Sequence, residues 1–436
     1  MTPSGLRPAP PPAAVRSRRA LLAGAAGNFV EWYEFSVYGC FATVIAATFW
    51  PGGGSGALVA TYASFALAFF FRPLGALLFG RIGDRIGRRP TLLLVIGLMT
   101  LATTLIGLLP TYAAAGPAAP VLLTLLRVLQ GLCAGGEFGG AVALMTELAP
   151  PGRRGLYGAL QSFTVALGLL GGVGAAALTA TFLSGEDLAD WGWRVPFLLA
   201  LPLGLAGLRL RAGLVEPPPP DARDGGTEPA GAAAAPARRG ELPRAVVLGA
   251  GRIMGWSAAG YTFLVVLPAY LQSTLHTSFR AALIAGVLTN LGFAAAVLPA
   301  GHLSDRVGRR PVMLAGALLV VVLSFPLLGL LQDPGSSVPA RAAALLAAGA
   351  VVGLMAGAGP AMLAEMFPAR VRCTGLGVAY ALANAVFSGC AGLVITAVTA
   401  RTGNADIPAH YAAGACALSA LALSTLRGDD HRRPLR

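Results

Sequence analysis

Apolar runs long enough to cross a membrane recur along this 436-residue chain, and no other feature constrains its fold as strongly. A bilayer core of ~30 Å is spanned by ~20 helical residues. Runs of that length lie at about 20–48, 57–80, 91–110, 118–147, 155–183 and 192–212, and then at about 244–272, 280–303, 311–331, 339–366, 373–399 and 405–426. We therefore expect an all-α integral membrane protein with about 12 transmembrane helices.

The composition favours a membrane protein over a water-soluble one. The chain is 56% hydrophobic and 12% charged, whereas typical soluble proteins are roughly 25% charged. Its net charge of +13 is compatible with nucleic-acid binding, but the basic residues lie between the apolar runs. With both termini cytoplasmic, most of the 32 fall in the tails and the even-numbered loops, as the positive-inside rule requires. We expect a multi-pass protein of the cell (plasma or inner) membrane and no nucleic-acid partner.

Changes in composition divide the chain into five parts. We expect a disordered cytoplasmic tail over 1–19, a six-helix bundle over 20–212 and a Pro-rich cytoplasmic linker over 213–243. A second six-helix bundle follows over 244–426, and a short cytoplasmic tail over 427–436. The linker is too rich in proline to form the output domain of a receptor.

A charged stretch occurs once in each half of the chain. Gly80-Arg-Ile-Gly-Asp84-Arg-Ile-Gly-Arg88-Arg89-Pro90 matches Gly301-His-Leu-Ser-Asp305-Arg-Val-Gly-Arg309-Arg310-Pro311. A second pair, beginning at Glu147 and Glu365, has nearly the same separation, and each pair lies between corresponding runs. The repeats predict two pseudo-symmetric bundles related by an axis along the membrane normal.

Charged residues inside the predicted spans are candidates for function. They include Glu31, Glu34, Arg127, Glu137 and Arg252. Each would cost at least ~2.5–3.5 kcal/mol at mid-bilayer, so these side chains should face the bundle interior. Helical spacing places a polar stripe on the first span, formed by Asn28, Glu31, Glu34 and Tyr38.

These residues suggest proton coupling and substrate binding. Glu34, with Glu31 and Glu137, is the candidate for taking and releasing a driving proton. Arg127 is the candidate for clasping a substrate carboxylate through its planar guanidinium. The other substrate-binding candidates are Asn28, Tyr38, Gln130, Arg252, Tyr261, Tyr380 and Asn384. The alternative is a fixed ion pair between Glu34 and Arg127 that only holds two spans together.

Both charged stretches resemble the signature of the major facilitator superfamily. A closer likeness, to its metabolite:proton symporter family, rests on further segments: Gly27-Asn28-Phe29-Val30-Glu31-Trp32-Tyr33-Glu34-Phe35, Phe71-Arg72-Pro73-Leu74-Gly75, Arg127-Val-Leu-Gln130-Gly131 with Gly135-Gly136-Glu137-Phe138, Trp193-Arg194-Val195-Pro196-Phe197, and Phe367-Pro368-x-Arg370-Val-Arg372-x-Thr374-Gly375. The chain departs from that family at Glu34, where Asp is usual, and at Ala381, where Asn is frequent.

This resemblance implies a secondary active transporter, functional as a monomer, that moves a small metabolite by alternating access. We expect proton-coupled symport of an organic acid of the alpha-ketoglutarate or shikimate type. A proline or betaine carrier is the first alternative, with aromatic residues holding a quaternary ammonium; a drug:proton antiporter is the second. We expect no enzyme activity, no cofactor besides the proton and no metal site, because the sequence has neither a P-loop nor clustered metal ligands.

The resemblance also implies a cytoplasmic gate at the repeated stretches. Asp84 should meet the start of the eleventh span near Cys373 and Thr374, and Asp305 the start of the fifth near Gly155. We place both aspartates just past helix ends. The predicted gate residues are Gly80, Asp84, Arg85, Gly87, Arg88, Arg89, Glu147, Arg154, Gly301, Asp305, Arg306, Gly308, Arg309, Arg310, Glu365 and Arg372. The alternative is that these charged loops serve only to orient the chain in the membrane.

Overall fold

The computed structural model describes residues 13–86, 88–135, 137–212, 241–368 and 371–426. Residues 1–12 of the predicted N-terminal tail, the predicted C-terminal tail and almost all of the predicted linker therefore lie outside the described residues. The prediction of disorder up to residue 19 is wrong for residues 13–19, which begin the first helix (Ala13–Cys40). Within the described residues the chain is nearly all helical, and no β-strand is present.

The first half contains ten α-helices: α1 (Ala13–Cys40), α2 (Ala42–Phe49), α3 (Gly54–Ile86), α4 (Arg88–Leu108), α5 (Tyr112–Ala115), α6 (Ala118–Ala134), α7 (Glu137–Glu147), α8 (Arg154–Phe182), α9 (Gly185–Asp187) and α10 (Arg194–Ala212). The second half contains α11 (Glu241–Gly260), α12 (Leu267–Ser273), α13 (Phe279–Val307), α14 (Arg309–Gln332), α15 (Val338–Met366), α16 (Arg372–Ala383), α17 (Ala391–Thr402) and α18 (Ile407–Ser424). Two π-helical turns, η3 (Tyr261–Val266) and η5 (Asn384–Gly389), join α11 to α12 and α16 to α17.

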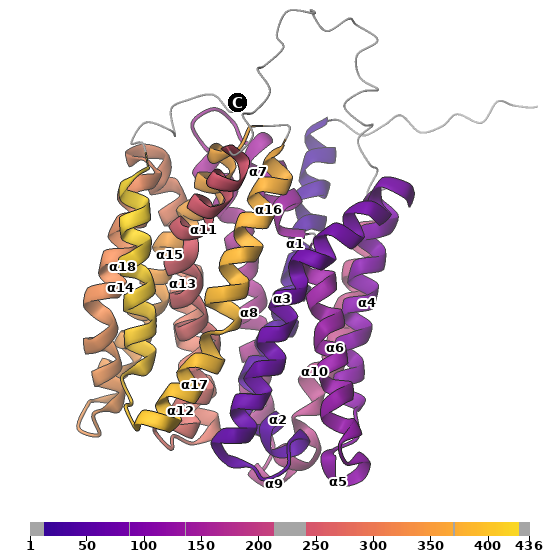
Figure 1. Cartoon of the computed structure of the whole chain (residues 1–436), viewed down its shortest axis with the longest axis vertical. Coiled ribbons are helices and arrows are strands. Elements are labelled where there is room, and N and C mark those ends of the chain that lie inside the picture. The colour runs from indigo at the N-terminus through magenta and orange to yellow at the C-terminus, as the bar shows by residue number, and fades with distance from the viewer. Residues whose placement is uncertain (1–12, 87, 136, 213–240, 369–370, 427–436) are drawn as a thin grey trace, which may run out of the picture.

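Eleven helical stretches of the described chain are long and apolar enough to cross a membrane. They coincide with the second to twelfth predicted runs. The first predicted run corresponds to α1 and α2, which stand beside the others (Figure 1). This segment is not among the eleven, and it carries Asn28, Glu31 and Glu34, which lower its apolar character.

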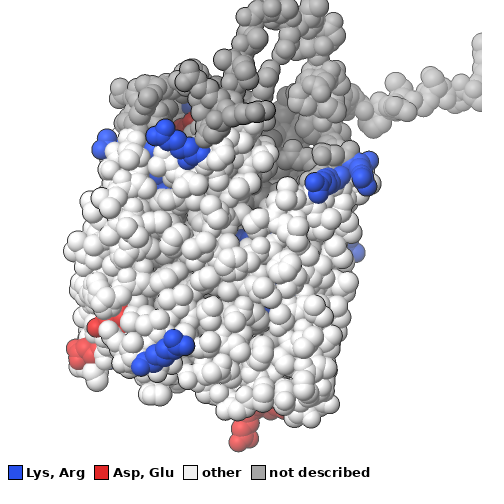
Figure 2. All heavy atoms as spheres, viewed as in Figure 1, with Lys and Arg blue, Asp and Glu red and all other residues white. Residues whose placement is uncertain are grey.

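The helices form two groups that stand side by side, with their long axes roughly parallel (Figure 1). The first group comprises α1 to α10 and the second α11 to α18, with α8 packed against α13 and α15 across the boundary. The broad middle of the face seen in Figure 2 is almost free of charge, and charged side chains gather mainly near its two ends. Large apolar side chains such as Leu125, Leu178 and Val322 are exposed on the helices. Lipid is the environment in which such a surface is stable.

Glycines allow very close helix packing at equivalent places in the two halves. In the first half, a Cβ at Gly131 would overlap the carbonyl oxygen of Ala68, so α3 and α6 touch backbone to backbone. In the second half, a Cβ at Gly349 would overlap the carbonyl oxygen of Thr289, between α13 and α15. These helices are the second and fourth predicted spans of each half. Small residues at membrane helix contacts permit this approach, and their recurrence supports the internal repeat.

Replacing Gly131 with alanine is expected to destabilise the protein. The new methyl group would force α3 and α6 apart, and overpacking of this kind costs ~1–3 kcal/mol. Gly97→Ala is the matched control, because a Cβ at Gly97 on α4 would meet no atom within 4 Å. Thermal unfolding of the purified variants in detergent measures the difference. Equal stability of the two variants would contradict the packing argument.

The expectation that Asp84 and Asp305 lie just past helix ends is wrong. Asp84 belongs to α3, which continues to Ile86, and Asp305 belongs to α13, which continues to Val307. The apolar runs mark the part of each helix that crosses the membrane, and each helix extends beyond it. Gly308 then turns the chain from α13 into α14 with φ of 102°, a conformation that favours glycine.

Candidate functional site

Two adjoining compartments lie between the two halves of the molecule. The charged compartment is lined by α1, α3, the junction of α6 and α7, and α16; its lining includes Asn28, Glu31, Trp32, Arg72, Phe138, Tyr380 and Ala381. The neutral compartment is lined by α1, α8, α11, η3, α13, α16 and η5; its lining includes Trp32, Ser162, Trp256, Ser257, Tyr261, Tyr380, Asn384 and Ser388. Trp32 and Tyr380 belong to both linings, so they form the shared wall.

An ion pair lies in the wall of the charged compartment. Arg72 Nη2 on α3 is 3.5 Å from Glu31 Oε1 on α1, and both side chains are almost completely buried. The Arg72 guanidinium lies 4.1 Å from the ring centre of Phe69 and 4.6 Å from that of Phe35. Its Nε and Nη2 atoms have no hydrogen-bond partner. Both atoms are buried, so the pair leaves unsatisfied donors in the wall of the compartment.

Asn28 also reaches the charged compartment, one turn of α1 before Glu31. Its side-chain amide donates to the carbonyl oxygen of Gln161 at 3.1 Å and to the hydroxyl of Thr164 on α8. Ala381 faces the same space. The departure from the family at this position therefore replaces an amide in the cavity wall with a methyl group.

Glu34 and Arg127 occupy a separate interior region of the first half and line neither compartment. Arg127 Nη1 donates to Gln130 Oε1 at 2.7 Å, and Gln130 Nε2 donates to Thr103 Oγ1 at 2.6 Å. The Arg127 guanidinium lies 4.1 Å from the ring centre of Tyr38. Among the described residues no ion pair joins Arg127 to a carboxylate, and neither carboxyl oxygen of the fully buried Glu34 has a hydrogen-bond partner. These contacts therefore do not include the fixed ion pair between Glu34 and Arg127 that the alternative prediction requires.

The remaining substrate candidates divide into two groups. Tyr261, Tyr380 and Asn384 line the neutral compartment, and the Tyr261 hydroxyl is buried without a hydrogen-bond partner. Arg252 lies elsewhere: its guanidinium contacts the Ala422 carbonyl oxygen at 3.4 Å and the Thr425 hydroxyl at 3.1 Å, tying α11 to the end of α18. The side chain of Glu137 lies outside the described residues.

Arg72 is a charged cavity residue that the sequence-based site omitted. A lone charge inside the second predicted span was the signal that could have identified it, since the same criterion selected Arg127 in the fourth. Trp32 and Trp256 were considered only as aromatic candidates for cation binding, and both line the cavity.

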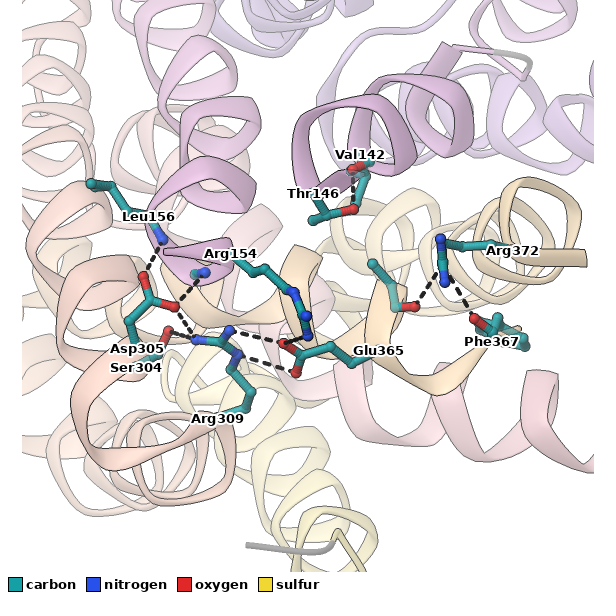
Figure 3. A network of polar contacts seen from close by, with 12 residues as sticks. Val142, Thr146, Arg154, Leu156, Ser304, Asp305, Arg309, Glu365, Phe367 and Arg372 are labelled. Atoms are coloured by element: carbon teal, nitrogen blue, oxygen red, sulfur yellow. Dashed lines mark hydrogen bonds and ion pairs between the residues drawn. The ribbon is translucent and has the colours of Figure 1, made fainter. Parts of the chain in front are cut away.

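At the end of the molecule that carries the repeated stretches, called here the motif end, a polar network joins the two halves (Figure 3). Asp305 Oδ1 accepts from the Gly155 N–H at 2.7 Å, and Oδ2 accepts from the Leu156 N–H at 2.9 Å. The contact expected between Asp305 and the start of the fifth span is thus present in the structure. Carboxylates are stabilised at helix N-termini by exposed N–H groups and the helix dipole.

Arginines extend this network on both sides. Arg309 Nη1 contacts Asp305 Oδ1 at 2.8 Å, and Arg309 Nη2 contacts Glu365 Oε1 at 2.9 Å; Arg154 reaches the same carboxylate at 3.9 Å. A second link across the halves joins Arg372 on α16 to Glu147 on α7 at 2.7 Å.

The other predicted gate residues make no side-chain polar contact in this network or lie outside the described part of the chain. Arg85 and Arg306 are exposed. Gly301 packs so closely on α8 that a Cβ there would overlap Ala159. The gate residues outside the described residues or side chains are Gly80, Asp84, Gly87, Arg88 and Arg89, so the expected contact of Asp84 with α16 has no structural account.

Replacing Asp305 with asparagine is expected to lower transport turnover by ~10-fold or more without reducing the amount of protein in the membrane. Asparagine loses the negative charge that the α8 N-terminus and Arg309 hold, and hydrogen bonds to charged groups contribute ~1.5–3 kcal/mol each. The measurement is initial uptake rate per inserted protein. Asp333→Asn is the control, because Asp333 is an exposed aspartate whose side chain bonds only to its own loop at Gly335 and Ser336. Parallel losses of insertion and transport would favour a purely topogenic role.

A membrane-spanning protein whose two helical halves enclose a charged cavity, and are joined by polar contacts at one end, has the architecture of a secondary transporter. Residues 20–218 match the family "Sugar (and other) transporter", and residues 249–436 match "Major Facilitator Superfamily". The chain is 32% identical to the proline/betaine transporter of Escherichia coli K12 over 90% of this chain and 80% of that one. It is 32% identical to the citrate-proton symporter of Klebsiella pneumoniae over 94% of each. The chain belongs to the major facilitator superfamily, among its metabolite:proton symporters.

A solved structure confirms the predicted fold. The crystal structure of a D-xylose-proton symporter superposes with a TM-score of 0.71, covering 92% of this chain and 97% of that one. The sequence identity is 19%, so this likeness concerns the fold alone.

Proposed function

We propose that this protein is a proton-coupled symporter that carries a small organic acid across the cell membrane by alternating access. The observation that carries the proposal is the Glu31–Arg72 pair in the wall of the cavity between the halves. Arginine binds carboxylates bidentately, and a carboxyl group beside it can hold the coupled proton.

The pair suggests how proton and substrate binding are linked. With Glu31 ionised, its carboxylate competes with a substrate for the Arg72 guanidinium. With Glu31 protonated, the guanidinium is released to a substrate carboxylate. Proton binding and substrate binding then favour each other, which is the requirement for symport. Glu34, three residues further along α1, remains a second candidate for the proton.

The two halves contact each other at both ends of the cavity. During transport, the contacts at one end would break while those at the other end remain. The motif end is joined by Asp305 with α8 and by Arg372 with Glu147. At the opposite end, the Thr43 hydroxyl on α2 donates to Gln272 Oε1 on α12 at 2.7 Å, and the rings of Phe41 and Phe279 are 5.6 Å apart. Rocking of one half against the other would open one end while the other stays joined.

The arginine distribution supports an orientation in which the motif end and both termini face the cytoplasm. A single chain encloses the whole cavity, so we expect a functional monomer. A betaine or proline carrier is the second candidate, because Trp32 and Tyr380 offer aromatic faces next to Glu31.

Uptake into proteoliposomes under an imposed pH gradient tests the proposal. Labelled organic acids, proline and glycine betaine are the probes, and a protonophore and protein-free liposomes are the controls. We expect gradient-driven accumulation of at least one organic acid that the protonophore abolishes. Uptake that ignores the gradient would exclude proton symport, and accumulation of betaine alone would favour the second candidate.

A further inference from the structure

We propose that Trp256 on α11 and Gly359 on α15 together set the width of the neutral compartment and thereby determine how wide a substrate body the protein accepts. This inference rests on the proposed function and adds a specificity determinant to the same cavity. It follows from the exposure of the Trp256 side chain, from the packing behind its ring and from the support of the neighbouring Tyr380.

Trp256 is the one described residue in the lining of the neutral compartment that is not buried. All the other lining residues are buried, whereas Trp256 is partly exposed. The span that contains Trp256, Leu242–Ser273, also has the largest buried share of the eleven candidate spans, so little of it can face lipid. The exposed surface of the indole ring therefore lies toward the compartment, where a substrate can contact it.

Behind the ring, α15 comes very close to Trp256 because residue 359 is glycine. A Cβ at Gly359 would lie 2.8 Å from Cζ3 and 2.9 Å from Cε3 of Trp256, a separation that real Cβ atoms essentially never show. The six-membered ring of the indole thus occupies the space that a side chain at residue 359 would need. Small residues at membrane helix contacts permit this kind of approach. The glycine therefore allows the indole to lie back from the compartment.

Tyr380 limits the movement of Trp256 on a second side. The two ring centres are 6.0 Å apart, and the ring planes are tilted by 53°. Tyr380 is in turn stacked face to face on Phe138 of α7, with ring centres 3.4 Å apart and an angle of 7° between the planes. Because Phe138 belongs to the first half of the molecule, Tyr380 is supported from across the boundary. A Trp256 ring displaced from α15 would therefore move into the compartment.

A single methyl group at residue 359 is thus expected to narrow the compartment. The indole is a rigid ring system, so it moves as a unit when one edge is pushed. Protein interiors are close-packed, and one methylene group in a binding pocket changes the discrimination between substrates by roughly 10–200-fold. Phenylalanine at residue 256 should have the opposite effect, because its single ring is smaller than the indole.

The test compares wild type with Gly359→Ala, Trp256→Phe and the double variant Gly359→Ala/Trp256→Phe in proteoliposomes. The probes increase in width from the unbranched 2-oxoglutarate through the branched citrate to the ring-bearing quinate, and proline and glycine betaine cover the second candidate function. Initial rates give the KM and kcat of each transported probe, and thermal unfolding in detergent reports on folding. Gly251→Ala is the matched control, because a Cβ at Gly251 on α11 would lie at an ordinary contact distance of 3.6 Å from Ala422.

We expect Gly359→Ala to raise the KM of the widest probe that wild type transports by about tenfold or more, with smaller effects on narrower probes and on kcat. The double variant should return this KM to within about threefold of wild type, because the smaller ring leaves room for the new methyl group. Trp256→Phe alone should improve the uptake of wide probes relative to narrow ones. The control Gly251→Ala should behave as wild type does.

An unchanged KM in Gly359→Ala, or an increase that the double variant does not reverse, would overturn this inference and leave symport intact. Equal losses for all probes together with a lower unfolding temperature would also overturn it, since they would indicate a purely structural contact. The KM values can be measured without a pH gradient, so wild-type uptake that ignores an imposed gradient would refute symport while these values still decide the role of Trp256. Transport of none of the probes by wild type would refute both.

Discussion

Replacing Glu31 with glutamine is expected to abolish proton-driven accumulation while preserving exchange of labelled for unlabelled substrate. Glutamine imitates the protonated carboxyl, so Arg72 stays released and the cavity binds the substrate at every pH. With one coupled proton, a gradient of about two pH units supports up to about 100-fold accumulation in the wild type. The variant should equilibrate its substrate without accumulating it.

Two measurements in the same proteoliposomes separate these outcomes. Accumulation is followed under an imposed pH gradient, and counterflow is followed without one. Wild-type uptake should rise as the outer pH falls, because protonation of Glu31 frees Arg72. Uptake by Glu31→Gln should be nearly independent of pH. Loss of counterflow together with accumulation would mean that Glu31 is needed for binding or folding and does not couple the proton.

Glu34→Gln is the matched control, since Glu34 lies on the same helix, is fully buried and lines neither compartment. We expect it to retain more proton-driven accumulation than Glu31→Gln. If Glu34→Gln instead uncouples transport and Glu31→Gln does not, the proton site lies in the interior region of Arg127. The original sequence-based choice of Glu34 would then be the correct one.

The architecture could be predicted from the sequence because a small number of physical constraints determine it. Membrane thickness sets the length of each apolar run, so the runs coincide with eleven of the helical stretches within one or two turns. The repeated charged stretches predicted that the two halves of the chain are related to each other. The Asp305 contact with Gly155 followed from the same resemblance, and both of its N–H donors lie at the first turn of α8.

The sequence did not predict which buried charges pair with each other, because the pairing depends on how each helix is rotated about its axis and on how closely neighbouring helices approach. Glu31 and Glu34 are less than one turn apart on α1, yet Glu31 faces the cavity and Glu34 faces the interior of the first half. The contact between Arg72 and Glu31 depends on how α3 is placed beside α1. The backbone of α3 is also held against Gly135, where a Cβ would overlap the Arg72 carbonyl oxygen. Such contacts depend on two helices at once, whereas the sequence pattern of one span reports only its own polar face.

The interpretation of Arg252 illustrates the same limit. A lone arginine in an apolar run indicates an inward-facing charge, but it does not say whether a cavity or another helix receives it. Here the guanidinium bonds to the end of α18. Satisfying a helix C-terminus and binding a substrate use the same donors, so only the neighbouring element distinguishes the two roles.

Substitutions of Arg72 are expected to lower the affinity for the substrate strongly. Arg72→Lys keeps the positive charge but loses the planar pair of donors, and should raise the KM by about tenfold. Arg72→Gln removes the anchor and also breaks the ion pair with Glu31. Breaking such a pair costs ~2–5 kcal/mol, so a loss of transport in this single variant does not distinguish misfolding from loss of the substrate anchor.

The double variant Glu31→Gln/Arg72→Gln removes that ambiguity. Its two amides are neutral and similar in shape to the original side chains, and neutral replacement of a buried ion pair is often tolerated. We expect a stable, monodisperse protein whose uptake of organic acids falls by at least about 100-fold, as expected for loss of a bidentate arginine–carboxylate contact. Arg127→Lys is the control: that guanidinium lines neither compartment, and its KM should change by less than about threefold. If the double variant transports as the wild type does, the pair has only a structural role in joining α1 to α3. A larger effect of Arg127→Lys would instead indicate that Arg127, in the fourth span, binds the substrate carboxylate.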